Sequence, residues 1–286
     1  MLVSRSIRDA AERLSAISDT ARLDAEVLMA HSLGISRTEL LLRRMGDPAP
    51  DAFGALVERR AGHEPVAYIT GVQEFFGLSF RVTPEVLIPR GDSEVLVEAA
   101  LRARPGARRV LDCGTGSGAL LLAVLANLPE AEGAGIDSSP GALEVAAGNA
   151  AALGLARARF ALRDWKEPGW SADLGRFDLI LANPPYVEED ADLAPSVRGH
   201  EPASALFAGP DGLEEYRVLI PQLTGLLAAG GAALVEIGHA QAEAVSAIAR
   251  DAGLSSTLHR DLAGRPRVLE LVGFRNISLG KRTGDH

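Results

Sequence analysis

Short apolar runs that alternate with helical stretches from Arg109 onward constrain the fold of this chain most. Each run has four to six residues and is bounded by turn residues, which is typical of buried strands. We predict strands at residues 110–113, 134–137, 159–162, 177–182, 232–237, 255–259 and 267–271. Strands that alternate with helices form a mostly parallel sheet with both faces covered. The sequence therefore predicts an α/β fold with a seven-stranded, Rossmann-like sheet.

A glycine-rich turn, Gly114-Thr115-Gly116-Ser117-Gly118, follows the first predicted strand and leads into a helix. Glycine lets a ligand approach the backbone, and a helix amino terminus favours a carboxylate or phosphate. The turn nearly matches the dinucleotide-binding fingerprint, with Ala119 in the third glycine position. Asp137 ends the second strand 21 positions after Gly116 (137 − 116), where a carboxylate can accept from both hydroxyls of a ribose. These features predict an adenosine-containing cofactor and fit a nicotinamide dinucleotide and S-adenosylmethionine equally.

Asp164 and Trp165 follow the third predicted strand, at the same edge of the sheet. The carboxylate could accept a hydrogen bond from an adenine amino group, and the indole could line the ring. A tryptophan in this place is about as often an ordinary core residue, so the pair does not identify the cofactor by itself.

The fourth predicted strand ends at Asn183-Pro184-Pro185-Tyr186. Two prolines end the strand and hold the backbone extended, so the segment could be a simple strand terminator with a core tyrosine. Alternatively, the Asn183 side-chain oxygen and the Pro184 carbonyl are two acceptors in fixed geometry, which suits the two hydrogens of a planar NH2 group beside the flat face of Tyr186. Hydride transfer would need a nicotinamide pocket and often a proton donor, and no His or Lys stands in such a position. We therefore favour methyl transfer to a planar nitrogen.

The first 90 residues have a different organisation. We predict four short helices: one that starts at Ser6 with Asp9 as its capping partner, one from Leu23 to Leu33 that ends at Gly34, one capped by Ser36 and Glu39, and one around Phe53–Val57 that ends before Gly62. Such a bundle is either a stabilising appendage or a substrate-docking module. The stretch from Phe75 to Arg90 predicts a β-hairpin linker. We expect a helical docking domain at residues 1–74, a linker at 75–90 and a catalytic domain at 91–286.

Composition disfavours several other classes of protein. The formal net charge is −9 and the only lysines are Lys166 and Lys281, which disfavours a broad surface for nucleic acid. The single cysteine, Cys113, leaves no disulfide within the chain and no cluster for a metal, and the six histidines lack metal-ligand spacing. A signal peptide and an apolar stretch of membrane-spanning length are both missing. We expect a cytoplasmic protein with no metal, membrane or direct nucleic-acid partner, and a polar tail from Arg275 to His286 that frays.

The glycine turn, Asp137 and Asn183-Pro184-Pro185-Tyr186 together resemble the class I S-adenosylmethionine-dependent methyltransferases that act on amide or exocyclic amino nitrogens. Within that class the chain is similar to the PrmC/HemK family, the protein-(glutamine-N5) methyltransferases of peptide chain release factors. The further matching blocks are residues 64–71, 74–78, 86–90, 111–118, 201–202, 205–206, 211–213, 216–217 and 261–265. One block departs from the family pattern: Gly91-Asp92-Ser93-Glu94 stands where the family has Pro-Glu-Thr-Glu, so the loop shape there and any contact of Asp92 are open.

The resemblance implies that the substrate is the glutamine of the Gly-Gly-Gln loop in bacterial class 1 release factors. By the resemblance, S-adenosylmethionine would be bound by Gly114, Thr115, Gly116, Ser117, Gly118, Asp137, Trp165 and Asn183. Asp164 is a further candidate because of its place beside Trp165. The glutamine would be bound by Asn183, Pro184, Pro185 and Tyr186, of which Asn183, Pro184 and Tyr186 would be catalytic. Two alternatives are an N6-adenine methyltransferase of DNA or RNA and a non-catalytic module that binds S-adenosylmethionine or release factors.

Overall fold

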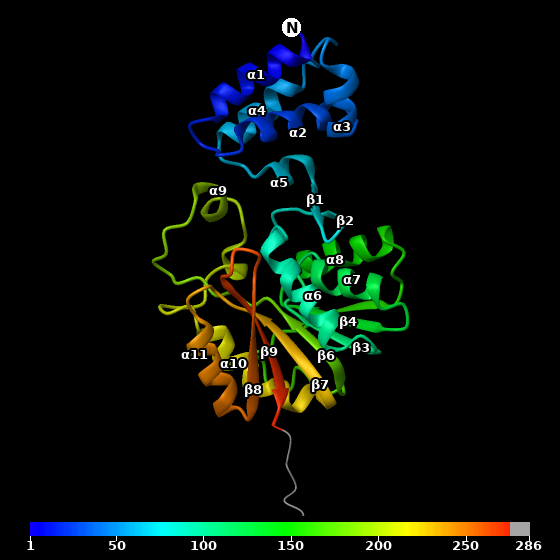
Figure 1. The fold of residues 1–286 in the computed structure, drawn as a ribbon, viewed down its shortest axis with the longest axis vertical. Coiled ribbons are helices and arrows are strands. Elements are labelled where there is room, and N and C mark those ends of the chain that lie inside the picture. The colour runs from blue at the N-terminus through cyan, green and yellow to red at the C-terminus, as the bar shows by residue number, and fades with distance from the viewer. Residues whose placement is uncertain (275–286) are drawn as a thin grey trace, which may run out of the picture.

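The computed structural model describes residues 1–274, which form a helical bundle, a two-stranded linker and a larger α/β domain (Figure 1). The expected fraying of the tail at 275–286 lies outside the described residues. The bundle stands at one end of the molecule, and the linker lies between it and the sheet of the α/β domain.

The bundle contains α1 (Val3–Leu14), α2 (Ala21–Leu33), α3 (Arg37–Glu39), the π-helical turn η1 (Leu40–Arg44), α4 (Phe53–Ala61) and α5 (Val66–Thr70). Its core is an apolar cluster of its own, because each longer helix turns one apolar stripe inward. The Ser36 cap is confirmed, since Ser36 Oγ accepts from the Glu39 N–H at 3.1 Å. The predicted start at Ser6 is wrong. Helix α1 begins at Val3 because Leu2 is held in a bridge to Pro48, and the Ser6 hydroxyl instead donates to the Leu2 carbonyl at 3.1 Å.

The linker is a hairpin of β1 (Val72–Phe75) and β2 (Leu78–Arg81), which turns at Phe76 and Gly77. It begins three residues earlier than position 75. The side chain of Asn149 fastens it to the α/β domain: its oxygen accepts from the Arg81 N–H at 2.8 Å, and its NH2 group donates to the carbonyls of Arg81 at 3.0 Å and Ser117 at 2.8 Å. The Asn149 side chain therefore links the hairpin to the glycine turn. The division into a docking domain, a linker and a catalytic domain stays a prediction.

The main sheet has seven strands, and all of its pairs are parallel except those that β9 makes with β7 and β8. This confirms the predicted mostly parallel sheet. The strand order is β5 (Ala158–Leu162), β4 (Glu132–Asp137), β3 (Arg109–Cys113), β6 (Phe177–Ala182), β7 (Leu227–Glu236), β9 (Pro266–Gly273) and β8 (Leu254–Arg260).

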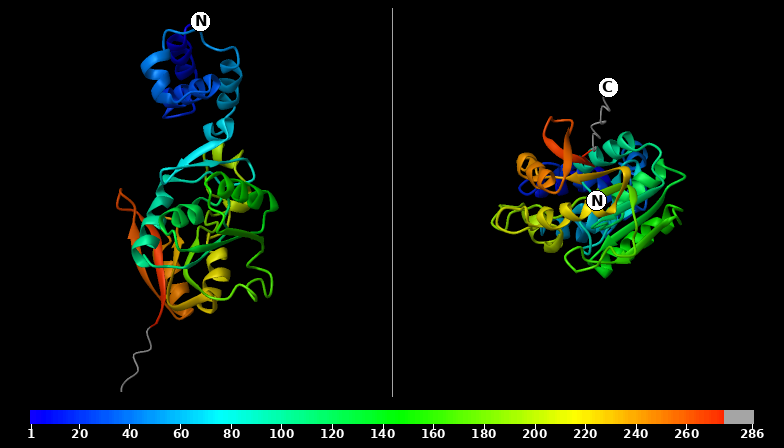
Figure 2. Two further views of the ribbon diagram at one scale, coloured as in Figure 1. Left: turned by 90° about the vertical axis from the view of Figure 1, so that its right-hand side faces the viewer. Right: turned by 90° about the horizontal axis from the view of Figure 1, so that it is seen from below.

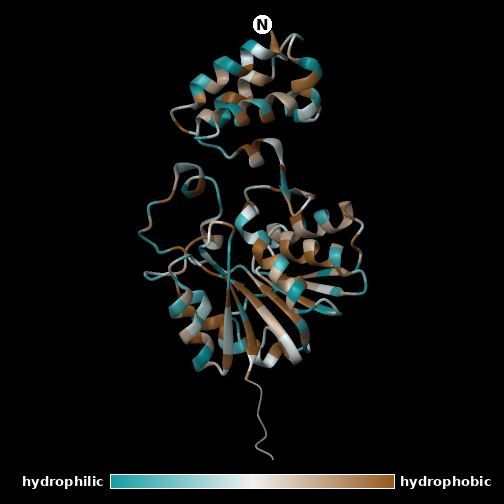
Figure 3. Ribbon diagram, viewed as in Figure 1, coloured by the Kyte–Doolittle hydropathy of each residue, from teal (hydrophilic) through white to brown (hydrophobic). Residues whose placement is uncertain are grey.

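Helices cover both faces of this sheet (Figure 2). The elements are η2 (Gly91–Ser93), α6 (Glu94–Ala103), α7 (Ala119–Asn127) and α8 (Pro140–Ala152) on one side, α10 (Glu214–Leu226) and α11 (Ala242–Asp251) on the other, and the short turns α9 (Pro195–Arg198) and η3 (Ala203–Ala205) in the connection after β6. Apolar residues concentrate on the central strands and the inward faces of the helices (Figure 3).

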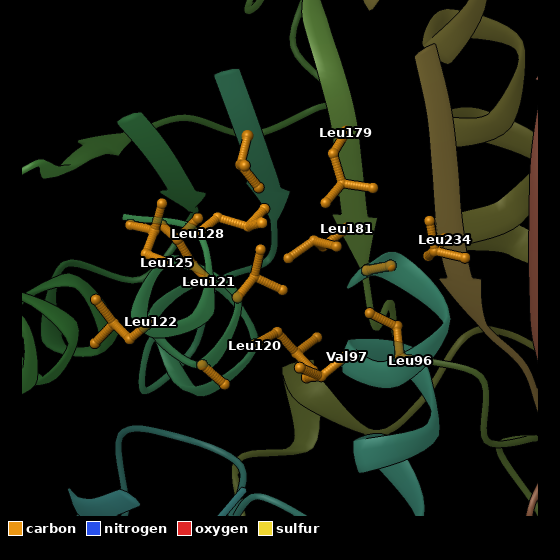
Figure 4. Close-up of a cluster of buried hydrophobic side chains, with 14 of the residues drawn as sticks. Leu96, Val97, Leu120, Leu121, Leu122, Leu125, Leu128, Leu179, Leu181 and Leu234 are labelled. Carbon is orange, nitrogen blue, oxygen red and sulfur yellow. The ribbon is translucent and has the colours of Figure 1, made fainter. Parts of the chain in front are cut away.

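Strand β6 shows why helices must cover both faces of the sheet. Side chains alternate between the faces of a strand, so Leu179 and Leu181 pack with leucines of α7 and α6 (Figure 4), whereas Ile180 packs in the cluster that contains α10. All three side chains are fully buried. Because helices cover both faces of the sheet, a ligand is expected to bind at the carboxyl ends of the strands.

Candidate active site

A cavity of 390 Å³ lies at the carboxyl ends of β3, β4, β5 and β6. Residues from the segments 85–90 and 202–207 also line it. The predicted site residues that line it are Gly114, Thr115, Gly116, Ser117, Asp137, Asp164, Trp165, Asn183 and Pro185. Residues from four separate strand ends therefore meet in one space.

Asp137 joins the glycine turn to the start of α8. Its two carboxylate oxygens accept from the backbone N–H groups of Gly116 and Ser139, each at 2.9 Å. Burial raises the pKa of Asp137, and these backbone donors oppose the rise. A carboxylate oxygen has more than one acceptor position, so Asp137 can hold the turn and still accept from a ligand in the cavity.

Asp112 lies beneath the glycine turn and was not singled out from the sequence. Its Oδ2 accepts from the Thr115 hydroxyl at 2.7 Å, whereas its Oδ1 has no partner within residues 1–274. Full burial raises the pKa of Asp112 to about 7. The side chain thus fixes Thr115 from below the turn.

Trp165 forms one wall of the cavity. Its indole N–H donates to Glu215 Oε2 at 2.8 Å, and Glu215 also pairs with Lys166 at 2.5 Å. A Cβ added to Gly114 would lie only 3.1 Å from the Trp165 ring, so a glycine there lets the turn and the indole pack against each other. Asp164 Oδ1 accepts from the Lys166 N–H at 2.8 Å, which orients this carboxylate beside the cavity.

The segment Asn183-Pro184-Pro185-Tyr186 follows β6, which lies between β3 and β7 in the sheet. The Tyr186 carbonyl accepts from Gln241 Nε2 at 3.0 Å. Gly212, with φ of +65°, lies against the same carbonyl, because a Cβ there would approach the Tyr186 oxygen to 2.4 Å. Backbone bonds of Val187 to Leu206 at 2.8 Å and to Ala208 at 2.9 Å hold the segment that follows. The loop is fixed by several distant parts of the chain.

Three predicted site residues lie outside the cavity wall. Gly118, with φ of +81°, starts α7 and packs against Leu122 and Ala146, which gives it a packing role. Pro184 and Tyr186 belong to the loop at the cavity edge but are not among its lining residues. Where they would contact a substrate therefore stays a prediction.

Several further lining residues are not among the site residues predicted from the sequence, and they include Arg90, Ser93 and Phe207. Arg90 is paired with the buried carboxylate of Glu201, which also accepts from the Ile88 N–H at 3.2 Å. Glu201 thereby holds the linker against the cavity. The only sequence signal for this contact is that residues 86–90 and 201–202 both belong to the blocks shared with the PrmC/HemK family.

The fold, the glycine turn and the cavity at the strand ends define a class I methyltransferase. A family model described as a methyltransferase domain matches residues 106–235, and one described as the PrmC N-terminal domain matches residues 6–71. A solved methyltransferase from Pyrococcus furiosus shares the fold, with a TM-score of 0.51 and 18% identity over 70% of this chain and 91% of that chain.

Curated relatives make the assignment narrower. The release factor glutamine methyltransferase of Cereibacter sphaeroides is 44% identical over 94% of this chain and 98% of its own length. That of Bordetella pertussis is 46% identical over 86% of this chain and 93% of its own length. The chain belongs to the release factor glutamine methyltransferase family, and the resemblance to PrmC/HemK is confirmed.

No helix within residues 1–274 is long and apolar enough to cross a membrane. The same residues contain no group of three or more His, Cys, Asp or Glu side chains placed to hold a metal ion.

Proposed function

We propose that this chain transfers a methyl group from S-adenosylmethionine to the side-chain amide nitrogen, N5, of the glutamine in the Gly-Gly-Gln loop of bacterial class 1 release factors. The observation that supports the proposal most is that Asn183 and Pro185 line the same cavity as the glycine turn and Asp137. Asn183, one of the two proposed amide acceptors, is therefore next to the groups suited to an adenosine cofactor.

The residues present fit S-adenosylmethionine. A Cβ added to Gly116 would meet no atom within 4 Å, so the space in front of the turn is open to a ligand. Asp137 would hold the ribose hydroxyls, Asp164 the adenine amino group, and Trp165 one side of the ring. When bound, S-adenosylmethionine supplies an electrophilic methyl group attached to a sulfonium.

An amide nitrogen is a weak nucleophile because its lone pair is delocalised into the carbonyl. Acceptors at Asn183 and Pro184 would hold both N–H groups of the glutamine, direct the nitrogen towards the methyl donor and favour its pyramidal form. Tyr186 would confine the amide from the side. In this mechanism positioning and electrostatics supply most of the acceleration. A strong base is not required before transfer, because the methylated amidium is far more acidic than the amide and can lose its proton afterwards.

The bundle at residues 1–74 is proposed to dock the release factor. It has its own apolar core, and none of the described residues that line the cavity comes from it. A variant that lacks residues 1–61 keeps α5 and the hydrogen bond of Tyr68 to Val86. It should still bind S-adenosylmethionine and methylate a short Gly-Gly-Gln peptide, while methylation of the intact release factor falls. Equal loss on both substrates would make the bundle a stabiliser instead.

The main alternative is methylation of adenine N6, which needs the same acceptor geometry. The net charge of −9 disfavours it, because nucleic-acid affinity depends on neutralising phosphates. The proposal is tested by incubating the protein with labelled S-adenosylmethionine and, separately, release factor, DNA and RNA. Mass spectrometry should place one methyl group on the loop glutamine, and a release factor with that glutamine changed to alanine should stay unlabelled. Label in DNA or RNA alone would overturn the proposal.

A further inference from the structure

A polar cluster, buried except for the exposed Asp92, lies behind Tyr186. It consists of Glu236 at the end of β7, Arg267 near the start of β9, and Asp92 and Ser93 in η2. Glu236 and Arg267 are 2% and 8% exposed. Asp92 and Ser93 belong to the block that departs from the family pattern, and the mechanism above uses none of the four residues.

Glu236 contacts the phenol end of Tyr186. The Tyr186 hydroxyl donates to Glu236 Oε1 in a long hydrogen bond of 3.4 Å. The sheet brings the two residues together, since Ala182 of β6 pairs with Val235 of β7 and the next residues along are Asn183 and Glu236. Gln241 holds the other end of Tyr186 through its carbonyl. The tyrosine is thus fixed at both ends by residues from other elements.

Arg267 and the residues of η2 lie close enough to Glu236 to shift its pKa. The Arg267 guanidinium pairs with Asp92 at 2.7 Å and with Asp261 at 3.4 Å. Glu236 Oε2 and Ser93 Oγ have no hydrogen-bond partner within residues 1–274, although Ser93 lies near enough to lower the pKa of Glu236. Ser93 also lines the cavity. The cluster therefore connects the cavity wall with the back of the Tyr186 loop.

The incomplete pairing of Glu236 argues for a role in the site. A buried carboxylate with one long hydrogen bond and one unpaired oxygen destabilises a fold. Such groups are expected where structure serves function instead of stability. We propose that Glu236 is a positioning residue that holds the Tyr186 ring beside the acceptor glutamine, and that the Arg267–Asp92 pair holds Glu236 in place. This inference rests on the proposed function and deepens it.

The groups that face Glu236 also give it a distinctive titration. They are Asp92 and Ser93 from η2, Tyr186 from the loop after β6, Tyr216 from α10 and Arg267 from β9. Burial raises the pKa of Glu236 to about 7, with Arg267 opposing the rise and Asp92 adding to it. The ionised Glu236 carboxylate only accepts hydrogen bonds, whereas its protonated form also carries a donor. The contact between Tyr186 and Glu236 therefore weakens as the pH falls through about 7 and Glu236 becomes protonated.

The test compares Glu236→Gln, Glu236→Ala and Tyr186→Phe with wild type. Loss of one buried hydrogen bond should lower kcat on release factor by roughly 10-fold in Glu236→Ala and less in Glu236→Gln, with S-adenosylmethionine affinity unchanged. The double variant Tyr186→Phe/Glu236→Ala should be no slower than Tyr186→Phe alone. Glu270→Gln is the matched control, since Glu270 lies on the same sheet and pairs with His259.

A second measurement does not depend on methyl transfer. The chain has three tyrosines, so labelling their ring carbons with 13C gives few enough NMR signals to assign Tyr186 by its loss in Tyr186→Phe. The Tyr186 signal should titrate near pH 7 in wild type and in Glu270→Gln, and should not titrate in Glu236→Gln. The positioning role would be overturned if the kcat losses of Tyr186→Phe and Glu236→Ala multiply in the double variant. It would also be overturned if the Tyr186 signal is the same in wild type and Glu236→Gln. A wild-type protein that leaves release factor unmethylated would instead overturn the proposed function, and the NMR titration would still decide the contact.

Discussion

The proposed cofactor half of the cavity, around the glycine turn and Asp137, and the proposed substrate half, at the Asn183–Tyr186 loop on its edge, are held together in different ways. In the cofactor half, Asp137 accepts from N–H groups 21 and 2 positions away, in turns that directly follow two neighbouring strands. In the substrate half, Tyr186 is held by the side chains of Gln241 and Glu236, 55 and 50 positions away. One half is built from strand-end turns and their backbone, and the other from long-range side-chain contacts.

This difference predicts how the two halves respond to mutation. A change in the cofactor half should alter S-adenosylmethionine affinity, because the groups that hold the turn are also the groups proposed to meet the ligand. A change in the substrate half should alter turnover at saturating cofactor, because its contacts orient a loop. The following experiments test that separation.

The largest effect is expected for Asp137→Ala. Charge-assisted hydrogen bonds are worth roughly 1.5–3 kcal/mol each, and Asp137 would make two of them with the ribose. Calorimetry should therefore show S-adenosylmethionine affinity reduced by roughly 100-fold or more. Asp178→Ala is a matched control, since Asp178 also accepts from two backbone N–H groups, of Arg108 and Arg109, but at the start of β6. Equal affinities in the two variants would contradict the role of Asp137.

A smaller loss, in turnover, is expected for Asn183→Ala. Removing one buried acceptor costs about 1–3 kcal/mol, so kcat should fall roughly 10-fold to 100-fold. Asn183→Asp keeps an oxygen of similar shape and should be less damaged, although its charge is costly to desolvate. Rates are measured on release factor with both proteins folded and saturated with S-adenosylmethionine. If kcat of Asn183→Ala equals that of Asn183→Asp or of wild type, Asn183 is not the acceptor.

Gly212→Ala should affect the substrate half through the backbone alone. The new methyl group would meet the Tyr186 carbonyl at 2.4 Å and would have to push the loop aside. We expect kcat to fall by about 10-fold, with S-adenosylmethionine affinity unchanged. Gly253→Ala has a similar positive φ, +79°, and no atom within 4 Å, so it should cost about 1 kcal/mol of stability and no turnover. A parallel loss in both variants would mean that only backbone strain matters.

The smallest effect concerns stability in the cofactor half. The folded-state pKa of Asp112 is raised from 3.8 to about 7, so the folded chain binds more protons than the unfolded chain between these values. This contribution to the free energy of unfolding is present at acidic pH and is lost as the pH rises from about 4 to 7. Asp112→Asn should therefore lose less stability between pH 5 and pH 8 than wild type in urea titrations. The same decline in both proteins would place the titration elsewhere, with Glu236 as the next candidate.

Much of the fold could be predicted because its signals are local. Seven apolar runs, the Ser36 cap and the glycine turn each depend on neighbouring residues, and the structure has the expected strands. Helix α1 shows the limit, since the bridge between Leu2 and Pro48 moves its start ahead of Ser6. Helix α5 was missed because five residues carry too little periodicity.

The sequence by itself determined the α/β class, the family and the residues that follow each strand, because strand pattern and turn chemistry are local and a parallel sheet gathers its carboxyl ends at one edge. Only the tertiary structure decided what holds those residues. The hydrogen bonds that hold them join residues 50 or more positions apart: Asn149 with the hairpin, Glu201 with Arg90, and Glu236 and Gln241 with Tyr186. A polar side chain acquires such a partner only when packing has excluded water and fixed the distance between them, and no spacing in the sequence records that.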